Sequence, residues 1–380
     1  MKKTLIKVFA LCLCLCMAIP AFASCAKKND TIVIGLSGPL TGAASVYGIA
    51  VKNSAQMAVD EINAAGGLNG TMFSLIATDD QHDASKVADN YANMMAQGMQ
   101  VSLGCVTTAP GLEFKKLSAA DNVFFLTPSA SGDEIPAEAN GYQMCFADGN
   151  QGSVAANYVN GLELSQIGIF YKSDDPYSKG IYDQFKANLK EGITTVEASF
   201  TGDNSDFTQQ IATLKNCTFI FMPIYYTPAS NFMTQAKDTV AANAVYYGCD
   251  GFDGLESAFD ITTISQKVIM LSHFNSKAEE GKAADYIKKY TEKFGTDTLN
   301  QFGASAYDCV YAIYGAMKAA VEAGKEIDAK TEAYELCEIL KEQFNGGYSY
   351  SGATGENIKW QSNGYVDKAA IAYVIKEANA

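Results

Sequence analysis

The sequence predicts an α/β protein with two lobes, each built on a parallel β-sheet, and three observations carry this prediction. The chain has 380 residues, which is long for one hydrophobic core and suits two. Apolar residues make up 48% and charged residues 18% of it, as in ordinary globular proteins. After residue 30, short β-rich runs alternate with amphipathic helical runs, a pattern typical of parallel sheets with crossover helices.

The first two dozen residues predict a signal peptide, residues 1–24, that exports the chain. Lys2, Lys3 and Lys7 precede an apolar run over residues 8–19, which is too short to span a bilayer. Residues 22–25 read FASC and resemble a lipobox, in which Cys25 would carry a lipid that anchors the protein to the cell membrane. The alternative is cleavage after the A-x-A sequence at 21–23, which would leave a secreted or periplasmic protein.

Strands and helices are expected to alternate through most of the chain. Strands are predicted at 31–36, 72–78, 101–106, 123–126, 166–171, 194–200, 218–223, 244–248 and 267–272. Helices are predicted at 43–65, 84–97, 112–120, 151–162, 178–191, 206–216, 229–240, 278–294 and 304–323. Extended segments at 348–357, 358–361 and 370–375, with a turn at 362–364, then suggest that the chain returns to complete a sheet.

Charge and residue usage argue against several classes of function. All 28 basic residues are lysines, and 42 acidic residues bring the net charge to −14. Nucleic acid, an anionic membrane surface and any site built on arginine are therefore disfavoured. His82 and His273 are the only histidines, which leaves little for a metal site or a histidine-based catalytic centre.

No enzyme or cofactor site is predicted, because the sequence has no Walker A motif, no G-x-G-x-x-G at its first helix and no G-x-S-x-G. Asp79 and Asp80 could form a pair for acid–base chemistry or Mg²⁺, but without further partners a solvated loop after a strand is favoured.

Six cysteines follow the predicted leader and first cysteine. Export permits disulfides among them, and six cysteines allow 15 pairings, so no pairing is predicted. None of them shows C-x-x-C or metal-ligand spacing, and buried free thiols are an equal alternative. The six are Cys105, Cys145, Cys217, Cys249, Cys309 and Cys337.

Several short motifs are informative because of the order in which they occur along the chain. The first long helix is expected to end at a glycine pair within INAAGGLNG, residues 62–70, where positive φ stops a helix. IGLSGPLTG at 34–42 precedes it, and Asp79-Asp80, DPYSKG at 175–180 and SGATG at 351–355 follow. Together these motifs resemble the extracytoplasmic substrate-binding proteins of ABC importers with the type I periplasmic-binding fold, specifically the branched-chain (Leu/Ile/Val) amino-acid binding family. The resemblance covers essentially the whole mature chain.

The resemblance implies two Rossmann-like lobes that are joined by three crossovers and close on a ligand by hinge motion. The crossovers are expected near 146–150, 273–276 and 356–359, so lobe one would be 31–147 plus 275–357 and lobe two 148–274 plus 358–380. It further implies capture of an amino acid, with an aliphatic branched one favoured, and delivery to the membrane subunits of an ABC permease. The alternatives are the same fold binding an amide, an aromatic amino acid, an organic acid or a polyamine-like cation, or a ligand sensor for a membrane receptor.

The carboxylate of such a ligand must be held by hydroxyls and backbone N–H groups, because the chain has no arginine. Thr107 and Thr108 lie between a strand and a helix with proline in its first turn, and Ser129, Ala130 and Ser131 follow the next strand. The carboxyl ends of neighbouring parallel strands form the ligand crevice of an open sheet. The resemblance points to the same two loops. Helix caps and turns would also explain these residues, and the spacing leaves open which threonine faces the ligand.

Asp250, after a strand of the second lobe, is the candidate partner for the ligand's ammonium group. The family commonly has glutamate here, and a turn aspartate before glycine is the alternative explanation. The resemblance also places four aromatic residues on the pocket wall, where they would supply apolar area. These are Tyr47, Tyr177, Tyr226 and Phe302.

Overall fold

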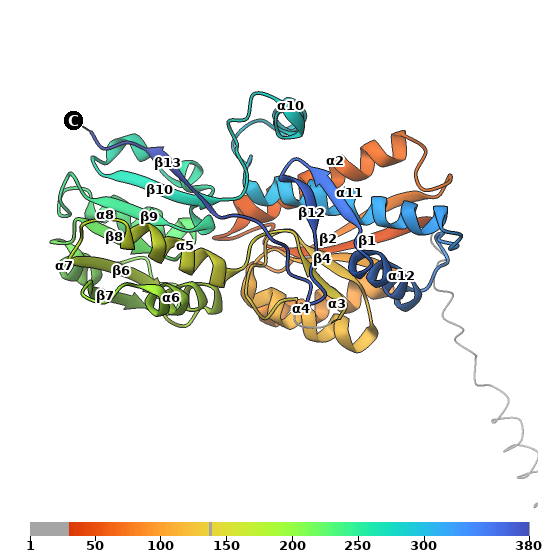
Figure 1. Cartoon of the computed structure of the whole chain (residues 1–380), viewed down its shortest axis with the longest axis horizontal. Coiled ribbons are helices and arrows are strands. Elements are labelled where there is room, and N and C mark those ends of the chain that lie inside the picture. The colour runs from red at the N-terminus through yellow and green to blue at the C-terminus, as the bar shows by residue number, and fades with distance from the viewer. Residues whose placement is uncertain (1–29, 137–138, 380) are drawn as a thin grey trace, which may run out of the picture.

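The computed structural model describes residues 30–136 and 139–379, and within them two lobes lie side by side (Figure 1). Lobe one contains a five-stranded sheet in the order β2-β1-β3-β4-β5. Lobe two contains a six-stranded sheet in the order β13-β10-β9-β8-β6-β7. Every strand pair of both sheets is parallel except β10 with β13. The predicted fold class is therefore confirmed.

Lobe one has a sheet whose central strand is buried on both faces. From Ile32 to Gly38 every residue of β1 is buried, as expected for a parallel strand with helices on either side. The strands are β1 (Thr31–Gly38), β2 (Met72–Asp79), β3 (Val101–Cys105), β4 (Phe125–Thr127) and β5 (Gly141–Gln143). The helices are α2 (Ser45–Ala64), α3 (Val87–Ala96), α4 (Thr108–Asp121), α10 (Gly281–Phe294), α11 (Gln301–Glu322) and α12 (Ala333–Asn345), and β11 (Ser349–Gly352) pairs with β12 (Gly355–Lys359).

Lobe two repeats the arrangement with shorter helices. Its strands are β6 (Gln166–Lys172), β7 (Thr194–Phe200), β8 (Phe219–Met222), β9 (Val245–Gly248), β10 (Lys267–Ser272) and β13 (Ile371–Lys376). Its helices are α5 (Asp148–Asn160), α6 (Pro176–Asn188), α7 (Thr208–Leu214), α8 (Tyr226–Ala236) and α9 (Leu255–Ala258). Strand β13 pairs antiparallel with β10, so the end of the chain does return to complete a sheet, as the sequence suggested.

The chain passes between the lobes in three places, and the third differs from the prediction. It leaves β5 for α5 over residues 144–147 and leaves β10 for α10 over residues 273–280. After β12, however, it stays on lobe one: Trp360 Nε1 donates to Gln143 O at 2.7 Å, and Gln143 N donates to Gly364 O at 3.0 Å. These contacts hold residues 360–364 against β5. We therefore place the last crossing beyond Gly364 and not at the predicted boundary of residue 357.

Several helices begin earlier than their apolar pattern predicts. Helices α4, α5, α8 and α11 start three or four residues before the predicted positions. Their first turns carry glycine, proline or polar residues, which the pattern assigned to loops. The predicted end of α2 agrees with the structure: Gly66 and Gly67 have φ of 100° and 66°, and Gly67 N donates to Ile62 O at 2.9 Å.

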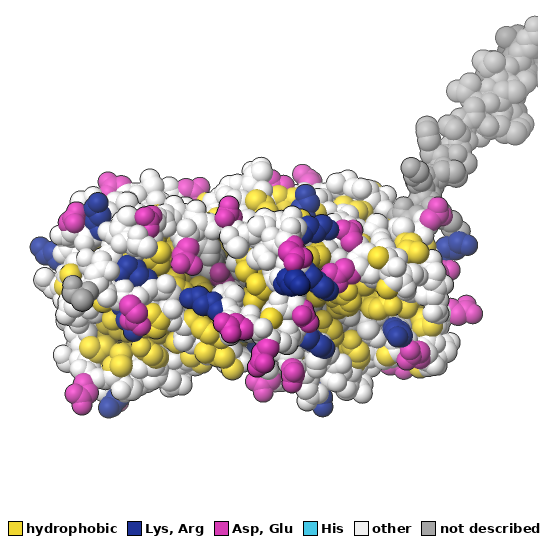
Figure 2. All heavy atoms as spheres, turned by 90° about the horizontal axis from the view of Figure 1, so that it is seen from above, with side chains coloured by type: hydrophobic (Ala, Val, Ile, Leu, Met, Phe, Trp, Pro, Cys, Tyr) yellow, Lys and Arg dark blue, Asp and Glu magenta, His cyan; other side chains and the backbone are white. Residues whose placement is uncertain are grey.

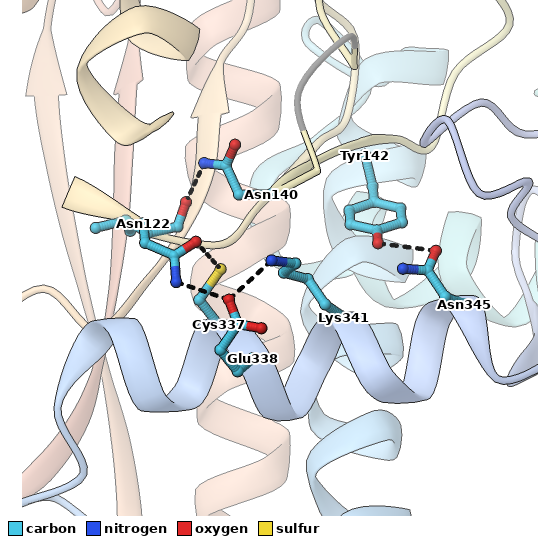
Figure 3. A network of polar contacts seen from close by, with 8 residues as sticks. Asn122, Asn140, Tyr142, Cys337, Glu338, Lys341 and Asn345 are labelled. Atoms are coloured by element: carbon cyan, nitrogen blue, oxygen red, sulfur yellow. Dashed lines mark hydrogen bonds and ion pairs between the residues drawn. The ribbon is translucent and has the colours of Figure 1, made fainter. Parts of the chain in front are cut away.

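Strand β5 and helix α12 were not predicted. Figure 3 shows how α12 docks on lobe one through side chains at its surface. Asn122, which ends α4 with a left-handed φ of 51°, donates to Glu338 Oε1 at 2.8 Å, and Lys341 pairs with the same carboxylate at 2.8 Å. Farther along α12, Tyr142 of β5 donates to Asn345 Oδ1 at 3.1 Å. The two missed elements therefore contact one another.

The face of the molecule drawn in Figure 2 carries lysine and acidic side chains intermixed, without a large basic patch. None of the described helices is long and apolar enough to cross a membrane. The six cysteines after the leader are all buried and free in the described structure, so the free-thiol alternative is the one that the structure shows.

Candidate functional site

A small cavity lies between the lobes, where strands of both sheets end. Lobe one reaches it from the carboxyl ends of β3 and β4 and from the first turns of α2 and α11, and lobe two from the ends of β6, β8 and β9. This is the crevice where open α/β sheets bind their ligands. The lining residues are Tyr47, Val106, Thr107, Ser129, Ser131, Tyr177, Tyr225, Asp250 and Phe302.

Hydroxyl groups line the lobe-one side of the cavity. Thr107 Oγ1 lies 2.9 Å from His82 Nδ1, and Ser129 Oγ donates to Val106 O at 2.7 Å. Burial is the main cause that lowers the pKa of His82 to about 4, so this imidazole is neutral at pH 7. Ser131 lies at the same wall, and its carbonyl accepts from Asp148 N at 2.8 Å. The wall therefore offers neutral groups to an anion and no cation.

A carboxylate stands on the lobe-two side. Asp250 is 1% exposed, its Oδ1 accepts from Tyr177 Oη at 2.6 Å, and its backbone N donates to Gln151 Oε1 at 2.9 Å. The Tyr177 hydroxyl also accepts from Gly251 N at 2.9 Å, which fixes the loop that carries Asp250. Burial raises the pKa of Asp250 to about 6, because a charge without a counter-ion is unfavourable in a closed cavity.

The lobes touch directly around the cavity. Tyr47 Oη on α2 donates to Gly251 O at 2.5 Å and accepts from Tyr226 N at 3.4 Å. The Tyr47 ring packs edge-on against Phe302, with ring centroids 4.7 Å apart. Thr227 Oγ1 donates to Ala43 O at 2.6 Å, farther out along the same interface. The structure therefore describes a closed cleft with its site enclosed.

Most of the residues predicted for the site come together in this cavity. Seven of them line it: Tyr47, Thr107, Ser129, Ser131, Tyr177, Asp250 and Phe302. Thr108, Ala130 and Tyr226 are buried nearby but are not among the lining residues. Thr108 points toward Gly132, Ala130 packs in the lobe-one core, and Tyr226 packs edge-on against Tyr47.

Val106 and Tyr225 also line the cavity, whereas the prediction did not include Val106 and chose Tyr226 of the pair Tyr225-Tyr226. Thr107 precedes α4 and Tyr225 precedes α8, and each helix has proline at its third position, Pro110 and Pro228. In both cases the residue three places before the proline faces the cavity and the next residue does not. Of the two threonines that the sequence left open, Thr107 lines the cavity and Thr108 does not.

The loop after β2 is structural, and the prediction of a solvated loop is wrong for Asp80. Asp80 is fully buried and accepts from Ser37 Oγ and His82 N, both at 3.0 Å. Burial raises the pKa of Asp80 to about 6. Asp79 accepts from Leu40 N at 2.9 Å and so ties down the loop before α2. Asp80 therefore fixes the backbone of His82, and the imidazole of His82 in turn contacts the Thr107 hydroxyl.

No cluster of three or more His, Cys, Asp and Glu side chains in the described part of the chain is arranged to hold a metal ion. The predicted signal peptide and the predicted lipidation site, Cys25, lie outside the described residues.

Comparisons with known proteins agree with this architecture. A family model described as periplasmic binding protein matches residues 31–378. The chain is 29% identical over 327 residues to the Leu/Ile/Val-binding protein BraC3 of Rhizobium johnstonii, which covers 83% of this chain and 85% of the relative.

Two solved structures show the likeness of fold. The substrate binding protein LivJ of a branched-chain amino acid transporter from Streptococcus pneumoniae, in complex with isoleucine, has a TM-score of 0.78 at 24% identity, with 92% and 96% of the two chains covered. A solute binding protein of an ABC transporter from R. palustris, in complex with benzoate, has a TM-score of 0.76 at 16% identity, with 92% and 94% covered.

Proposed function

The chain belongs to the periplasmic binding protein family, and from that membership we propose that it captures an amino acid outside the cytoplasm and delivers it to an ABC permease. The family is extracytoplasmic and consists of binding proteins, not enzymes. An aliphatic, branched amino acid is the favoured ligand, since relatives such as BraC3 are named for Leu, Ile and Val.

The observation that carries the proposal is that the two walls of the closed cavity differ in chemistry, with hydroxyl groups on lobe one and a carboxylate on lobe two. Thr107 and Ser131 supply hydroxyls on lobe one, while Asp250 supplies a carboxylate on lobe two. A zwitterionic amino acid needs both: neutral donors for its carboxylate and an acid for its ammonium group. A ligand without an ammonium group would leave Asp250 buried without a counter-ion, which is costly.

The rest of the wall suits a small apolar side chain. Val106, Tyr47, Tyr225 and Phe302 surround the polar groups. We propose that the carboxylate binds lobe one first, and that hinge closure then brings Asp250 to the ammonium group.

The proposal is tested by a thermal-shift screen on residues 26–380, after partial unfolding and dialysis to strip any carried-over ligand. The compounds are the twenty amino acids, amides, organic acids including benzoate, polyamines and sugars. A ligand that binds only the folded state raises the melting temperature. We expect shifts with leucine, isoleucine and valine. Shifts confined to compounds without an α-ammonium group would refute the proposed role of Asp250 and favour the organic-acid alternative.

Delivery to a permease, as opposed to signalling through a membrane receptor, is tested in the producing cell. Deletion of this protein should abolish uptake of the radiolabelled ligand at low concentration, and re-expression should restore it. Normal uptake in the deletion strain would favour the sensor alternative.

We also propose that Cys25 carries a lipid anchor. The FASC sequence at 22–25 supports this proposal, since a small residue precedes the cysteine at the end of an apolar run. Cells that express the chain with Cys25→Ala should release it from the membrane fraction. Equal membrane retention of the variant would favour cleavage at the A-x-A sequence or another form of attachment.

A further inference from the structure

A second hollow between the lobes adjoins the ligand cavity, and we call it the outer chamber. The residues that line it include Ala44 and His82 of lobe one and Phe200, Tyr225, Pro228 and Asn231 of lobe two. Of these six, Tyr225 alone also lines the ligand cavity. Thr227 and Ala43, whose hydrogen bond joins the lobes, belong to the wall of the outer chamber as well. The closed cleft therefore contains two hollows that share the side chain of Tyr225.

Rings from both lobes hold the Tyr225 ring in place. Within lobe two it stacks on Tyr177, with ring centroids 4.3 Å apart and ring planes at 11° to one another. From lobe one, His82 meets it edge to face at 5.0 Å and Tyr47 lies at 6.0 Å. The Tyr225 hydroxyl is buried and has no hydrogen-bond partner in the described structure. Aromatic packing, and not a hydrogen bond of this hydroxyl, therefore fixes the side chain.

Tyr225 and His82 together separate the ligand cavity from the outer chamber. His82 lines the outer chamber, and its Nδ1 lies 2.9 Å from Oγ1 of Thr107, which lines the ligand cavity. Asp80 also accepts from the backbone N of His82, so lobe one holds this half of the partition by two polar contacts. The other half is the Tyr225 ring, which borders both hollows. Removal of that ring would therefore join them.

We propose that Tyr225 limits the length of the ligand's side chain, and that the outer chamber is the space from which its ring excludes longer side chains. The proposal rests on the proposed function, in which the polar groups of the cavity hold the charged end of an amino acid. A side chain too long for the cavity meets a ring that is packed on both sides, and close-packed interiors yield little to an extra methylene. Beyond the ring, Phe200 and Pro228 offer apolar surface to such a side chain.

A series of straight-chain α-amino acids from norvaline to 2-aminooctanoate tests the proposal, because its members differ by one methylene at each step. Titration calorimetry on the ligand-free protein gives the dissociation constant of each. For the wild type we expect a length limit, with the longest member bound at least about tenfold more weakly than norleucine. For Tyr225→Ala the limit should disappear, and affinity should rise by up to about fourfold for each methylene that the outer chamber buries.

Two further variants separate the ring from the hydroxyl and the outer chamber from other space. Tyr225→Phe is the matched control: it keeps the ring and should keep the length limit. Asn231 lines the outer chamber and not the ligand cavity, so Asn231→Trp added to Tyr225→Ala should fill the chamber and restore the limit. Circular dichroism melts show whether each variant folds. Should Tyr225→Ala fail to fold, Tyr225→Val also removes the ring and takes its place.

Several results overturn the inference and leave the proposed function standing. One is a wild type that binds 2-aminooctanoate as tightly as norleucine, and another is the wild-type limit in Tyr225→Ala. Loss of the limit in Tyr225→Phe would assign it to the hydroxyl and not to the ring. A double variant that still accepts long side chains would show that they do not enter the outer chamber. Failure of every amino acid in the thermal-shift screen would instead remove the proposed function, and this inference with it.

Discussion

Tyr47→Phe tests whether one hydroxyl holds the lobes closed. The Tyr47 hydroxyl donates to Gly251 O at 2.5 Å and accepts from Tyr226 N at 3.4 Å, so both of its bonds cross from lobe one to lobe two. Phenylalanine keeps the ring, which continues to pack edge-on against Phe302 and Tyr226. When the lobes separate, water can replace both bonds. The substitution therefore weakens the closed state and leaves the open state nearly unchanged.

The expected magnitude follows from the two bonds. A neutral hydrogen bond contributes about 0.5–1.5 kcal/mol net, and the second bond is long, so closure should lose about 1–2 kcal/mol. That corresponds to a factor of roughly 5–30 in the closed-to-open ratio. If the ligand is retained only in the closed state and the free protein is mostly open, the dissociation constant rises by the same factor, which titration calorimetry measures. If the free protein is mostly closed, the loss appears instead as a larger radius of gyration of the ligand-free protein, which solution X-ray scattering measures.

The matched control is Tyr246→Phe. The Tyr246 hydroxyl is buried in lobe two without a partner, and its removal should change neither affinity nor radius of gyration. An unchanged dissociation constant for Tyr47→Phe, together with an unchanged radius of gyration, would refute the idea that this hydroxyl stabilises closure. A loss of affinity with both variants would instead point to a general sensitivity to loss of buried phenols.

Three further substitutions probe the site, the crossings and the core. Ser131→Ala should weaken amino-acid binding by about 1.5–3 kcal/mol, the contribution of a hydrogen bond to a charged group, and unchanged affinity in calorimetry would exclude this hydroxyl from the site. Lys368 is buried with Nζ 2.6 Å from Thr354 Oγ1, and burial lowers its pKa to about 8, below about 10.4 in an unfolded chain. Between pH 8 and pH 10 the unfolded chain therefore binds more protons than the folded one, so the free energy of unfolding of the wild type should rise relative to that of Lys368→Met. Denaturation midpoints that change equally with pH in the two proteins would contradict this. Phe344→Ala should cost about 3–5 kcal/mol of unfolding free energy in urea titrations, since the ring is buried against Phe124 and Trp360; a loss below about 1 kcal/mol would show that α12 contributes little to the fold.

The sequence was most informative where its pattern is regular. β7 and β10 were predicted to the residue, because each is a short β-rich run bounded by turn residues. β5 has three residues, too few for any periodicity, and its place at the sheet edge depends on the strand beside it. α12 has buried residues at Leu336, Leu340 and Phe344, at helical spacing, but exposed charged residues between them dilute the pattern.

The candidate site shows the same limit at the level of single residues. A pair such as Tyr225-Tyr226 presents two similar side chains, and only the exact start of the helix decides which one faces the cleft. Helix starts are the least certain part of a sequence-based prediction.

The charge of the closed cavity predicts that affinity changes with pH in opposite directions for two classes of ligand, amino acids and organic acids without an ammonium group. Lobe one presents only neutral groups, so the nearest charge to any ligand is that of Asp250, whose pKa burial raises to about 6. An amino acid pairs its ammonium group with the ionised carboxylate, so its affinity should rise with pH through 6. An organic acid such as benzoate brings no cation, so the cleft could close on it only with Asp250 protonated, and its affinity should fall over the same range. Calorimetry at pH 5 and pH 8 distinguishes the two, and Asp250→Asn should flatten both responses near pH 6; an amino acid that binds more tightly at pH 5 would contradict the assigned role of Asp250.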